Sequence, residues 1–232
     1  MKKILVIIPA RSGSKGVKNK NIKLLGDKPL IGWSILAAQK SKYMPRVLVT
    51  TDAEEIKKVS LDMGAEVPFL RPKELASDEV HSVYPILHAL NWLSENDNYH
   101  PDIVIMLLPT SPLRTAKDID NAIDLYLKNP DHNVISVTEL DKQLPHLRYV
   151  ENGLLVPVQK QGNYNVQRQD LQKLYYLNGS IYVSDFSRLL EDKTFHIEKT
   201  IAYIMDKDRS VDINTEEDFK QAEYLLKLKY GK

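Results

Sequence analysis

The chain has 232 residues, of which 43% are hydrophobic and 27% charged, with a formal net charge of +1 and no cysteine. The near-neutral charge excludes a general nucleic-acid binder, because nothing global would release counterions from a phosphate backbone. The lack of cysteine excludes disulfides, thiolate metal sites and cysteine nucleophiles, which fits a reducing cytoplasm. No apolar run reaches eighteen residues, so the sequence predicts a soluble, cytoplasmic protein without a membrane span.

The first predicted element is a strand at residues 4–10, a wholly apolar run typical of a strand buried on both faces. A polar loop follows at residues 11–21, with two glycines, one arginine and three lysines. Exposed backbone N–H groups and cations at the end of a strand favour polyphosphate binding. The spacing of Gly13 and Gly16 matches neither the Walker P-loop nor the dinucleotide fingerprint. A solvated basic loop is the alternative.

Helices and strands are predicted to alternate along the next 120 residues. The expected elements are a helix from Pro29, a strand at 46–50, a helix that Asp52 caps with Glu55, a short strand at 66–70, a helix through Val83, Leu87 and Leu90, a strand at 103–108, a helix starting at Thr115 and Asp118, and a strand at 134–137. This order predicts an α/β, Rossmann-like fold with a mostly parallel sheet flanked by helices. The polar loops after the strands should therefore meet at one edge, where such sheets bind ligands.

The alternation ends after residue 138, and we expect an insertion at about residues 139–175. It contains a predicted β-hairpin at 149–158 with Asn152-Gly153 as its turn. Because an isolated hairpin is marginally stable in water, we expect it to pack on a second subunit of a homodimer. Further strands are predicted at 176–183, 200–205 and 210–214, and Thr215 and Asp218 should cap the last helix. We treat residues 1–232 as a single domain.

A series of short motifs runs from about Ile4 to Leu225. They are Ala10-Arg11, Ser14-Lys15-Gly16, Lys20-Asn21, Leu70-Arg71-Pro72, Glu74-Leu75-Ala76, Pro109 to Arg114, Arg168-Gln169, Asn178-Gly179, Ile181-Tyr182 and Asp212-Ile213 before Thr215-Glu216. In this order they resemble the cytidylyltransferases that activate sialic acids, and the loop at 16–22 also resembles the bacterial legionaminic-acid enzymes. The resemblance implies a nucleotidyltransferase in which the anomeric hydroxyl of a nonulosonic acid attacks the α-phosphate of CTP, giving the CMP-sugar and pyrophosphate.

The resemblance also implies roles for individual side chains. Catalytic roles fall to Arg11, Lys15, Lys20 and Asp212; nucleotide binding to Arg11, Ser14, Lys15, Asn21, Arg71 and Ser82; sugar binding to Leu108, Arg168, Tyr182 and Phe195; and Mg²⁺ binding to Asp212 and Asn214. The chemistry suits these residues, since cations neutralise a triphosphate and Arg168 has the fork that pairs with a sugar carboxylate. The partners implied are CTP and a nine-carbon sugar acid.

The sequence departs from the family pattern at two positions. Asn214 stands where relatives carry a second metal-binding aspartate, and it brings no charge; it could instead help to cap the last helix. Leu108 stands where sialic-acid enzymes carry a glutamine that contacts the sugar. An apolar side chain there favours a sugar with an acetamido or deoxy methyl group nearby, as in legionaminic acid.

Two alternatives remain at this stage. One is a cytidylyltransferase for the eight-carbon 3-deoxy-octulosonate, which would share the core but not the sugar pocket. The other is a non-catalytic nucleotide-binding relative, which Asn214 favours. The combination of Arg11, Lys15, Lys20 and Arg168 favours an enzyme.

Overall fold

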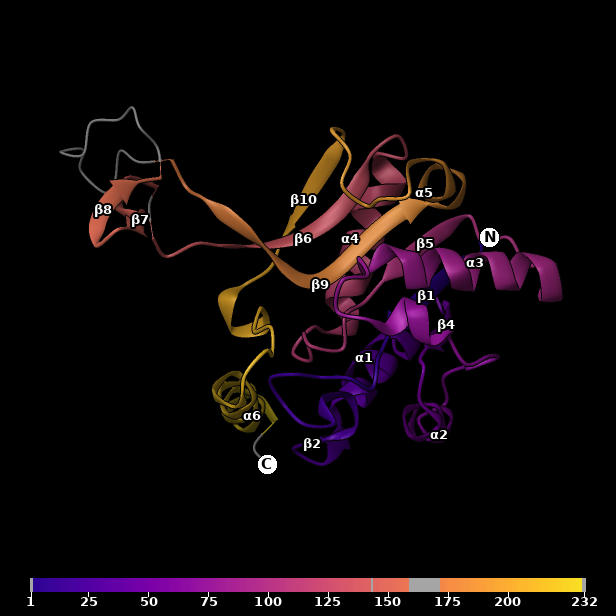
Figure 1. Cartoon of the computed structure of the whole chain (residues 1–232). Coiled ribbons are helices and arrows are strands. Elements are labelled where there is room, and N and C mark those ends of the chain that lie inside the picture. The colour runs from indigo at the N-terminus through magenta and orange to yellow at the C-terminus, as the bar shows by residue number, and fades with distance from the viewer. Residues whose placement is uncertain (1, 143, 159–171, 231–232) are drawn as a thin grey trace.

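The computed structural model describes residues 2–142, 144–158 and 172–230. Its centre is a six-stranded sheet with the order β10-β6-β9-β5-β1-β4 (Figure 1). The strands are β1 (Ile4–Pro9), β4 (Arg46–Thr50), β5 (Ile103–Met106), β6 (Asn133–Glu139), β9 (Tyr175–Asp185) and β10 (Thr200–Ile204), and two further small sheets pair β2 (Leu24–Leu25) with β3 (Lys28–Pro29) and β7 (Arg148–Glu151) with β8 (Leu154–Pro157).

Helices cover both faces of this sheet. They are α1 (Leu30–Gln39), α2 (Glu54–Asp62), α3 (Val83–Asp97), α4 (Ala116–Lys128), α5 (Phe186–Asp192) and α6 (Glu216–Tyr230), with short 3₁₀ turns at Lys20–Ile22, Lys73–Ala76, Leu144–His146 and Lys207–Arg209. Alternate side chains of β1 point into two separate cores, Val6 toward α1, α2 and α4 and Leu5 toward α3 and α5. No helix in the described ranges is both long and apolar enough to cross a bilayer.

The pairing confirms the predicted Rossmann-like class, with one antiparallel exception. β1 pairs in parallel with β4 and β5, and β6 pairs in parallel with β10. β9 lies between β5 and β6 and runs antiparallel to both. Because β9 lies next to β5, Asn178 and Gly179 lie beside the loop that follows β5. There Gly179 approaches Leu108 and Ser111.

Three local predictions are wrong. Residues 66–70 form only a single bridge, from Glu66 to Leu48, and Pro68 has no N–H to donate to a ladder. Ala53, and not Asp52, occupies the N-cap of α2, because the Asp52 carboxylate accepts hydrogen bonds from Ser12 instead. Residues 211–214 are irregular, and not a strand.

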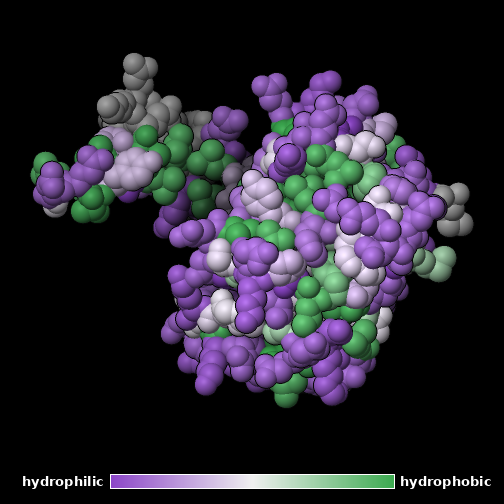
Figure 2. Space-filling model, turned by 45° about the vertical axis from the view of Figure 1, so that its right-hand side comes forward, coloured by the Kyte–Doolittle hydropathy of each residue, from purple (hydrophilic) through white to green (hydrophobic). Residues whose placement is uncertain are grey.

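The β7–β8 hairpin projects from the main body, as Figure 1 shows. Its turn is the predicted Asn152-Gly153, and both residues have positive φ, as a two-residue hairpin turn requires. Green side chains gather on this arm in Figure 2. They include Val150 and Leu155, which lie opposite each other across the two strands and are 74% and 72% exposed.

A third, smaller core fixes the loop at 11–21 to the C-terminal part of the chain. Val17 is fully buried in it, together with Ile213 and with Phe219 of α6. The predicted cap of α6 is confirmed, since Asp218 Oδ2 accepts from the Thr215 N–H at 2.8 Å and Thr215 Oγ1 accepts from the Asp218 N–H at 3.2 Å. Helix α6 therefore holds residues 212–214 against the loop.

Candidate active site

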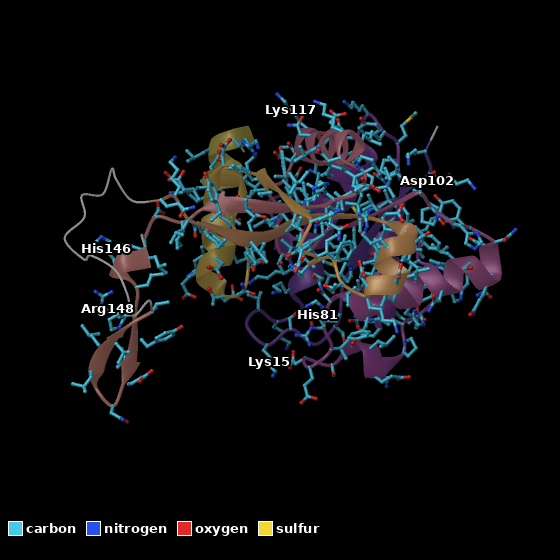
Figure 3. All side chains as sticks on the ribbon, turned by 90° about the horizontal axis from the view of Figure 1, so that it is seen from above. Lys15, His81, Asp102, Lys117, His146 and Arg148 are labelled. Carbon is cyan, nitrogen blue, oxygen red and sulfur yellow. The ribbon has the colours of Figure 1, made fainter. Side chains whose placement is uncertain are left out.

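A cavity of about 360 Å³ lies at the carboxyl end of β1, between the loop at 11–21, the loop at 71–82 and the end of β5. Nine of the predicted site residues line it: Arg11, Ser14, Lys15, Lys20, Asn21, Arg71, Ser82, Leu108 and Asn214. Figure 3 shows Lys15 from one of these loops and His81 from another at the same edge of the molecule. The tertiary structure thus brings together residues from opposite ends of the sequence, such as Arg11 and Asn214.

Close backbone contacts fix the loop at 11–21. The Lys20 ammonium donates to the Ile213 carbonyl at 2.8 Å, and the Asn21 side chain donates to the Arg11 carbonyl at 2.9 Å. At Gly16 a β-carbon would lie 1.9 Å from the Asn214 carbonyl oxygen, so only glycine permits this approach. The loop is therefore held by residues 213–214 and is not a freely solvated basic segment.

The three predicted cations differ in environment. Arg11 and Lys15 both pair with the carboxylate of Asp78, Lys15 at 2.6 Å. Hydrogen bonds from Lys15 and Arg11 lower the pKa of Asp78, so this carboxylate is ionised at neutral pH. Partial burial lowers the pKa of Lys20, and the nearby Asp212 opposes that shift. All three side chains line the cavity, and their positive charges favour the binding of an anion there.

Arg71 lies deeper at the base of the cavity. Its side chain is almost fully buried, and its Nη2 lies 3.7 Å from Asp52 Oδ1. Burial lowers the pKa of Arg71. Burial also acts to raise the pKa of Asp52, but hydrogen bonds from Ser12 and from the Asp52 backbone, together with the charge of Arg71, leave that pKa lowered. Arg71 Nε is buried and has no hydrogen-bond partner in the described residues.

Asp212 and Asn214 contact each other although they are not on a strand. The Asn214 amide donates to Asp212 Oδ2 at 2.9 Å, and its backbone N–H donates to Asp218, which supports the cap of α6. Asp212 Oδ1 is buried and has no hydrogen-bond partner in the described part of the chain. A buried, unpaired carboxylate oxygen suits a cation. Within the described ranges no group of three or more acidic, histidine or cysteine side chains gathers to hold a metal.

Three further predicted site residues are described but do not line the cavity, namely Asp212, Tyr182 and Phe195. Tyr182 and Phe195 are buried and pack against each other at 5.7 Å between ring centroids. Burial raises the pKa of Tyr182, and the charge of Asp212 adds to the shift, so this ring lies on the Asp212 side of the site. Arg168 lies outside the described residues. The sugar-binding roles stay predictions.

Two supporting residues had no predicted role. The guanidinium of Arg114 is buried, and it donates to the Leu108 carbonyl, to Ser34 Oγ at 2.8 Å and to the Ser180 carbonyl at 3.0 Å. Burial lowers the pKa of Arg114 to about 9, which leaves it charged at neutral pH. Asn178 is also buried and its side chain joins Ser136 Oγ at 2.6 Å to Ser210 Oγ at 2.9 Å.

These two residues hold the loop after β5 and the segment before Asp212 in place. Both belong to motifs that the sequence contains, Pro109 to Arg114 and Asn178-Gly179. Their presence in these motifs was the available signal. Their partners were not readable, because they come from distant elements.

Known proteins of one family are similar to this chain. The family described as "Cytidylyltransferase" matches residues 5–230. The chain is 36% identical over 231 residues to "Post-translational flagellin modification protein B" of Campylobacter coli, covering 99% of this chain and 97% of that protein. It is 33% identical over 228 residues to "CMP-N,N'-diacetyllegionaminic acid synthase" of Legionella pneumophila, covering 97% of each.

A third relative is longer than this chain. "N-acylneuraminate cytidylyltransferase" of Escherichia coli O18:K1:H7 is 36% identical over 221 residues, which are 95% of this chain and 51% of that protein. Among solved structures, CMP:2-keto-3-deoxy-manno-octonic acid synthetase complexed with CTP superposes with a TM-score of 0.73 over 98% of this chain and 99% of that one, at 14% identity. This last likeness shows the shared fold. With the match over residues 5–230 and these relatives, the chain belongs to the cytidylyltransferase family and, within it, to the CMP-sialic acid synthetases.

Proposed function

We propose that this protein couples CTP to an N-acylated nine-carbon sugar acid and releases pyrophosphate. The observation that carries the proposal is the cavity lined by Arg11, Lys15 and Lys20, where the lining residue Asn214 also donates a hydrogen bond to Asp212. A nucleoside triphosphate carries about four negative charges, and its reaction needs positioning and charge neutralisation more than covalent chemistry. Relatives named for legionaminic, pseudaminic and N-acylneuraminic acids support the sugar class.

Residues at different positions in the cavity would contact different parts of the substrate. Arg11, Lys15 and Lys20 would bind the triphosphate, and Asn21, Arg71 and Ser82 would contact the nucleoside. In the reaction the anomeric oxygen forms a bond to the α-phosphorus, and the bond from the α-phosphorus to the oxygen that bridges to the β-phosphorus breaks. Pyrophosphate leaves with the electron pair of that bond, and the hydroxyl proton passes to solvent water. Cations placed on the leaving side stabilise the charge that develops there.

Asp212 is the described side chain that fits Mg²⁺, through its unpaired Oδ1. Bound Mg²⁺ would supply charge neutralisation and orientation at the phosphates. Asn214 donates its amide to Asp212, so it orients the carboxylate in this structure and brings no second charge. Because one carboxylate supplies few of the oxygen ligands that Mg²⁺ needs, oxygens of the nucleotide would supply others.

The eight-carbon alternative has weaker support. Its solved representative shares 14% identity with this chain, which is a likeness of fold. Leu108 lines the cavity and is half-buried, and an apolar contact there favours a sugar with a methyl or acetamido group over one that presents only hydroxyls. The CMP-sugar formed would be an activated donor for a glycosyl-transfer reaction.

The test of this function is pyrophosphate release with CTP, UTP, ATP and GTP against a panel of eight- and nine-carbon sugar acids. We expect turnover with CTP and an N-acylated nine-carbon acid. Arg71→Ala should weaken CTP binding by roughly tenfold to a hundredfold, because a charged donor to the nucleoside is lost. Arg71→Lys keeps the charge but not the forked guanidinium, so its affinity for CTP should lie between those of the wild type and Arg71→Ala. Equal turnover with UTP or ATP would contradict the role of Arg71, and the absence of any turnover would favour the non-catalytic alternative.

We also propose a homodimer that the β7–β8 hairpin helps to form. The hairpin pairs only with itself within the described residues, and Tyr149, Val150, Leu154 and Leu155 are more than half exposed. A concentrated apolar surface of this kind on a projecting element favours contact with another chain.

We expect Leu155→Lys to shift the protein from dimer to monomer in light scattering at assay concentration. The matched control is Leu24→Lys, since Leu24 is 64% exposed and lies in β2, away from the hairpin. It should leave the dimer intact. A wild-type protein that is monomeric and fully active would refute the proposed assembly.

A further inference from the structure

Two cations of the site, Arg11 and Lys15, pair with the same carboxylate, that of Asp78. Arg11 Nη2 pairs with Asp78 Oδ1, and Lys15 Nζ lies 2.6 Å from Asp78 Oδ2. Arg11 Nη1 also approaches the Ala76 carbonyl at 3.5 Å. Each oxygen of the Asp78 carboxylate thus pairs with a different cation. Two oxygens of a phosphate group could pair with the same two cations.

Asp78 occupies the same space that an anionic ligand would need. It lines the cavity together with Arg11 and Lys15, and it comes from the loop between the 3₁₀ turn at Lys73–Ala76 and α3. In the described residues its carboxylate contacts only these two cations. The Asp78 carboxylate therefore contacts the loop at 11–21 through these two ion pairs.

A role in stability does not explain this contact. The Asp78 side chain is 38% exposed and that of Lys15 81% exposed, and ion pairs at such positions contribute little to folding. The contrast with Asp52 is informative, because Asp52 accepts from the Ser12 N–H at 3.0 Å and from Ser12 Oγ at 2.6 Å and is thus built into the framework. Asp78 has no such support and can exchange partners.

We propose that Asp78 is an internal counter-anion that competes with pyrophosphate for Arg11 and Lys15 and so promotes release of this product. The inference rests on the proposed function, since pyrophosphate leaves the same cations. Arg11 and Lys15 would bind the phosphates of CTP before the reaction and those of pyrophosphate after it. If they bind both equally well, this binding does not accelerate the chemical step, and it slows the release of pyrophosphate. When the Asp78 carboxylate pairs again with both cations, it lowers their affinity for pyrophosphate. It lowers the affinity for CTP as well, but CTP keeps its contacts with the nucleoside subsite.

The test is titration of the full chain with pyrophosphate by calorimetry, for the wild type and for Asp78→Asn, Asp78→Glu and Glu79→Gln. Glu79 is the adjacent acid and is exposed, so Glu79→Gln removes the same charge without touching the two cations. We expect Asp78→Asn to bind pyrophosphate about three- to tenfold more tightly, because the anion no longer displaces two ion pairs. Asp78→Glu and Glu79→Gln should stay within about twofold of the wild type, and high salt should shrink the gain of Asp78→Asn.

Product inhibition gives a second measurement. Pyrophosphate should inhibit Asp78→Asn at a lower concentration than it inhibits the wild type. Unchanged or weaker pyrophosphate binding by Asp78→Asn would overturn the inference, and so would an equal gain in Glu79→Gln, which would show a general effect of net charge. If the wild type turns over CTP while Asp78→Asn behaves like it, the inference alone fails. If the wild type binds neither CTP nor pyrophosphate, the proposed function fails and the inference fails with it.

Discussion

Asp212→Ala should lower kcat by about 10³-fold, because the variant loses the carboxylate that we propose holds Mg²⁺ at the phosphates. The fold should remain, since Oδ1 has no hydrogen-bond partner in the described residues and Oδ2 accepts only from the Asn214 amide. Steady-state kinetics at saturating CTP and Mg²⁺, with thermal melting as the check on folding, measure both effects. Near-normal turnover would make Asp212 a structural residue.

Asn214→Asp is the informative companion to that variant. The substitution removes the 2.9 Å hydrogen bond to Asp212 and places two carboxylates together, and their repulsion is relieved when a cation binds between them. We therefore expect tighter Mg²⁺ binding than in the wild type, and a melting temperature that falls in chelator and recovers with Mg²⁺. CTP should strengthen Mg²⁺ binding in the wild type by linkage, because the nucleotide supplies ligands.

Gly16→Ala should lower kcat by about 10²-fold, because the two segments that form the site can no longer approach each other. The new β-carbon would lie 1.9 Å from the Asn214 carbonyl oxygen, so the contact must open by about 1 Å, and a displacement of this size at a site is costly. The same movement would break the bond from Lys20 to the Ile213 carbonyl. The variant should also melt at a lower temperature, as overpacked positions do.

Gly13→Ala is the matched control in the same loop. A β-carbon at Gly13 meets nothing within 4 Å, and this glycine does not have positive φ. Its variant should keep wild-type kinetics and stability. If both alanine variants behave alike, the approach between the loop at 11–21 and Asn214 is not needed for activity.

The sequence by itself determined the framework of this protein. Wholly apolar runs such as residues 4–10 and 103–108 have few ways to be buried, so they became β1 and the region of β5 at the centre of the sheet. The pair Asn152-Gly153 selects a two-residue hairpin turn by its backbone preference, and Thr215 with Asp218 marks a helix start. These signals are local, so neighbouring residues are enough to carry them. The ordered motifs also indicated the family.

The tertiary structure alone decided how the site is assembled. Asp52 follows a strand and precedes an acidic turn, which is a cap pattern, yet Ser12 from another loop takes its carboxylate. Likewise, nothing near Asp78 in the sequence shows that it would bridge Arg11 and Lys15, and nothing near Gly16 shows the carbonyl of Asn214 above it. Each of these contacts joins segments that are distant in the chain. Their geometry exists only once the sheet and α6 have set the separation of the loops, so no local pattern could have encoded it.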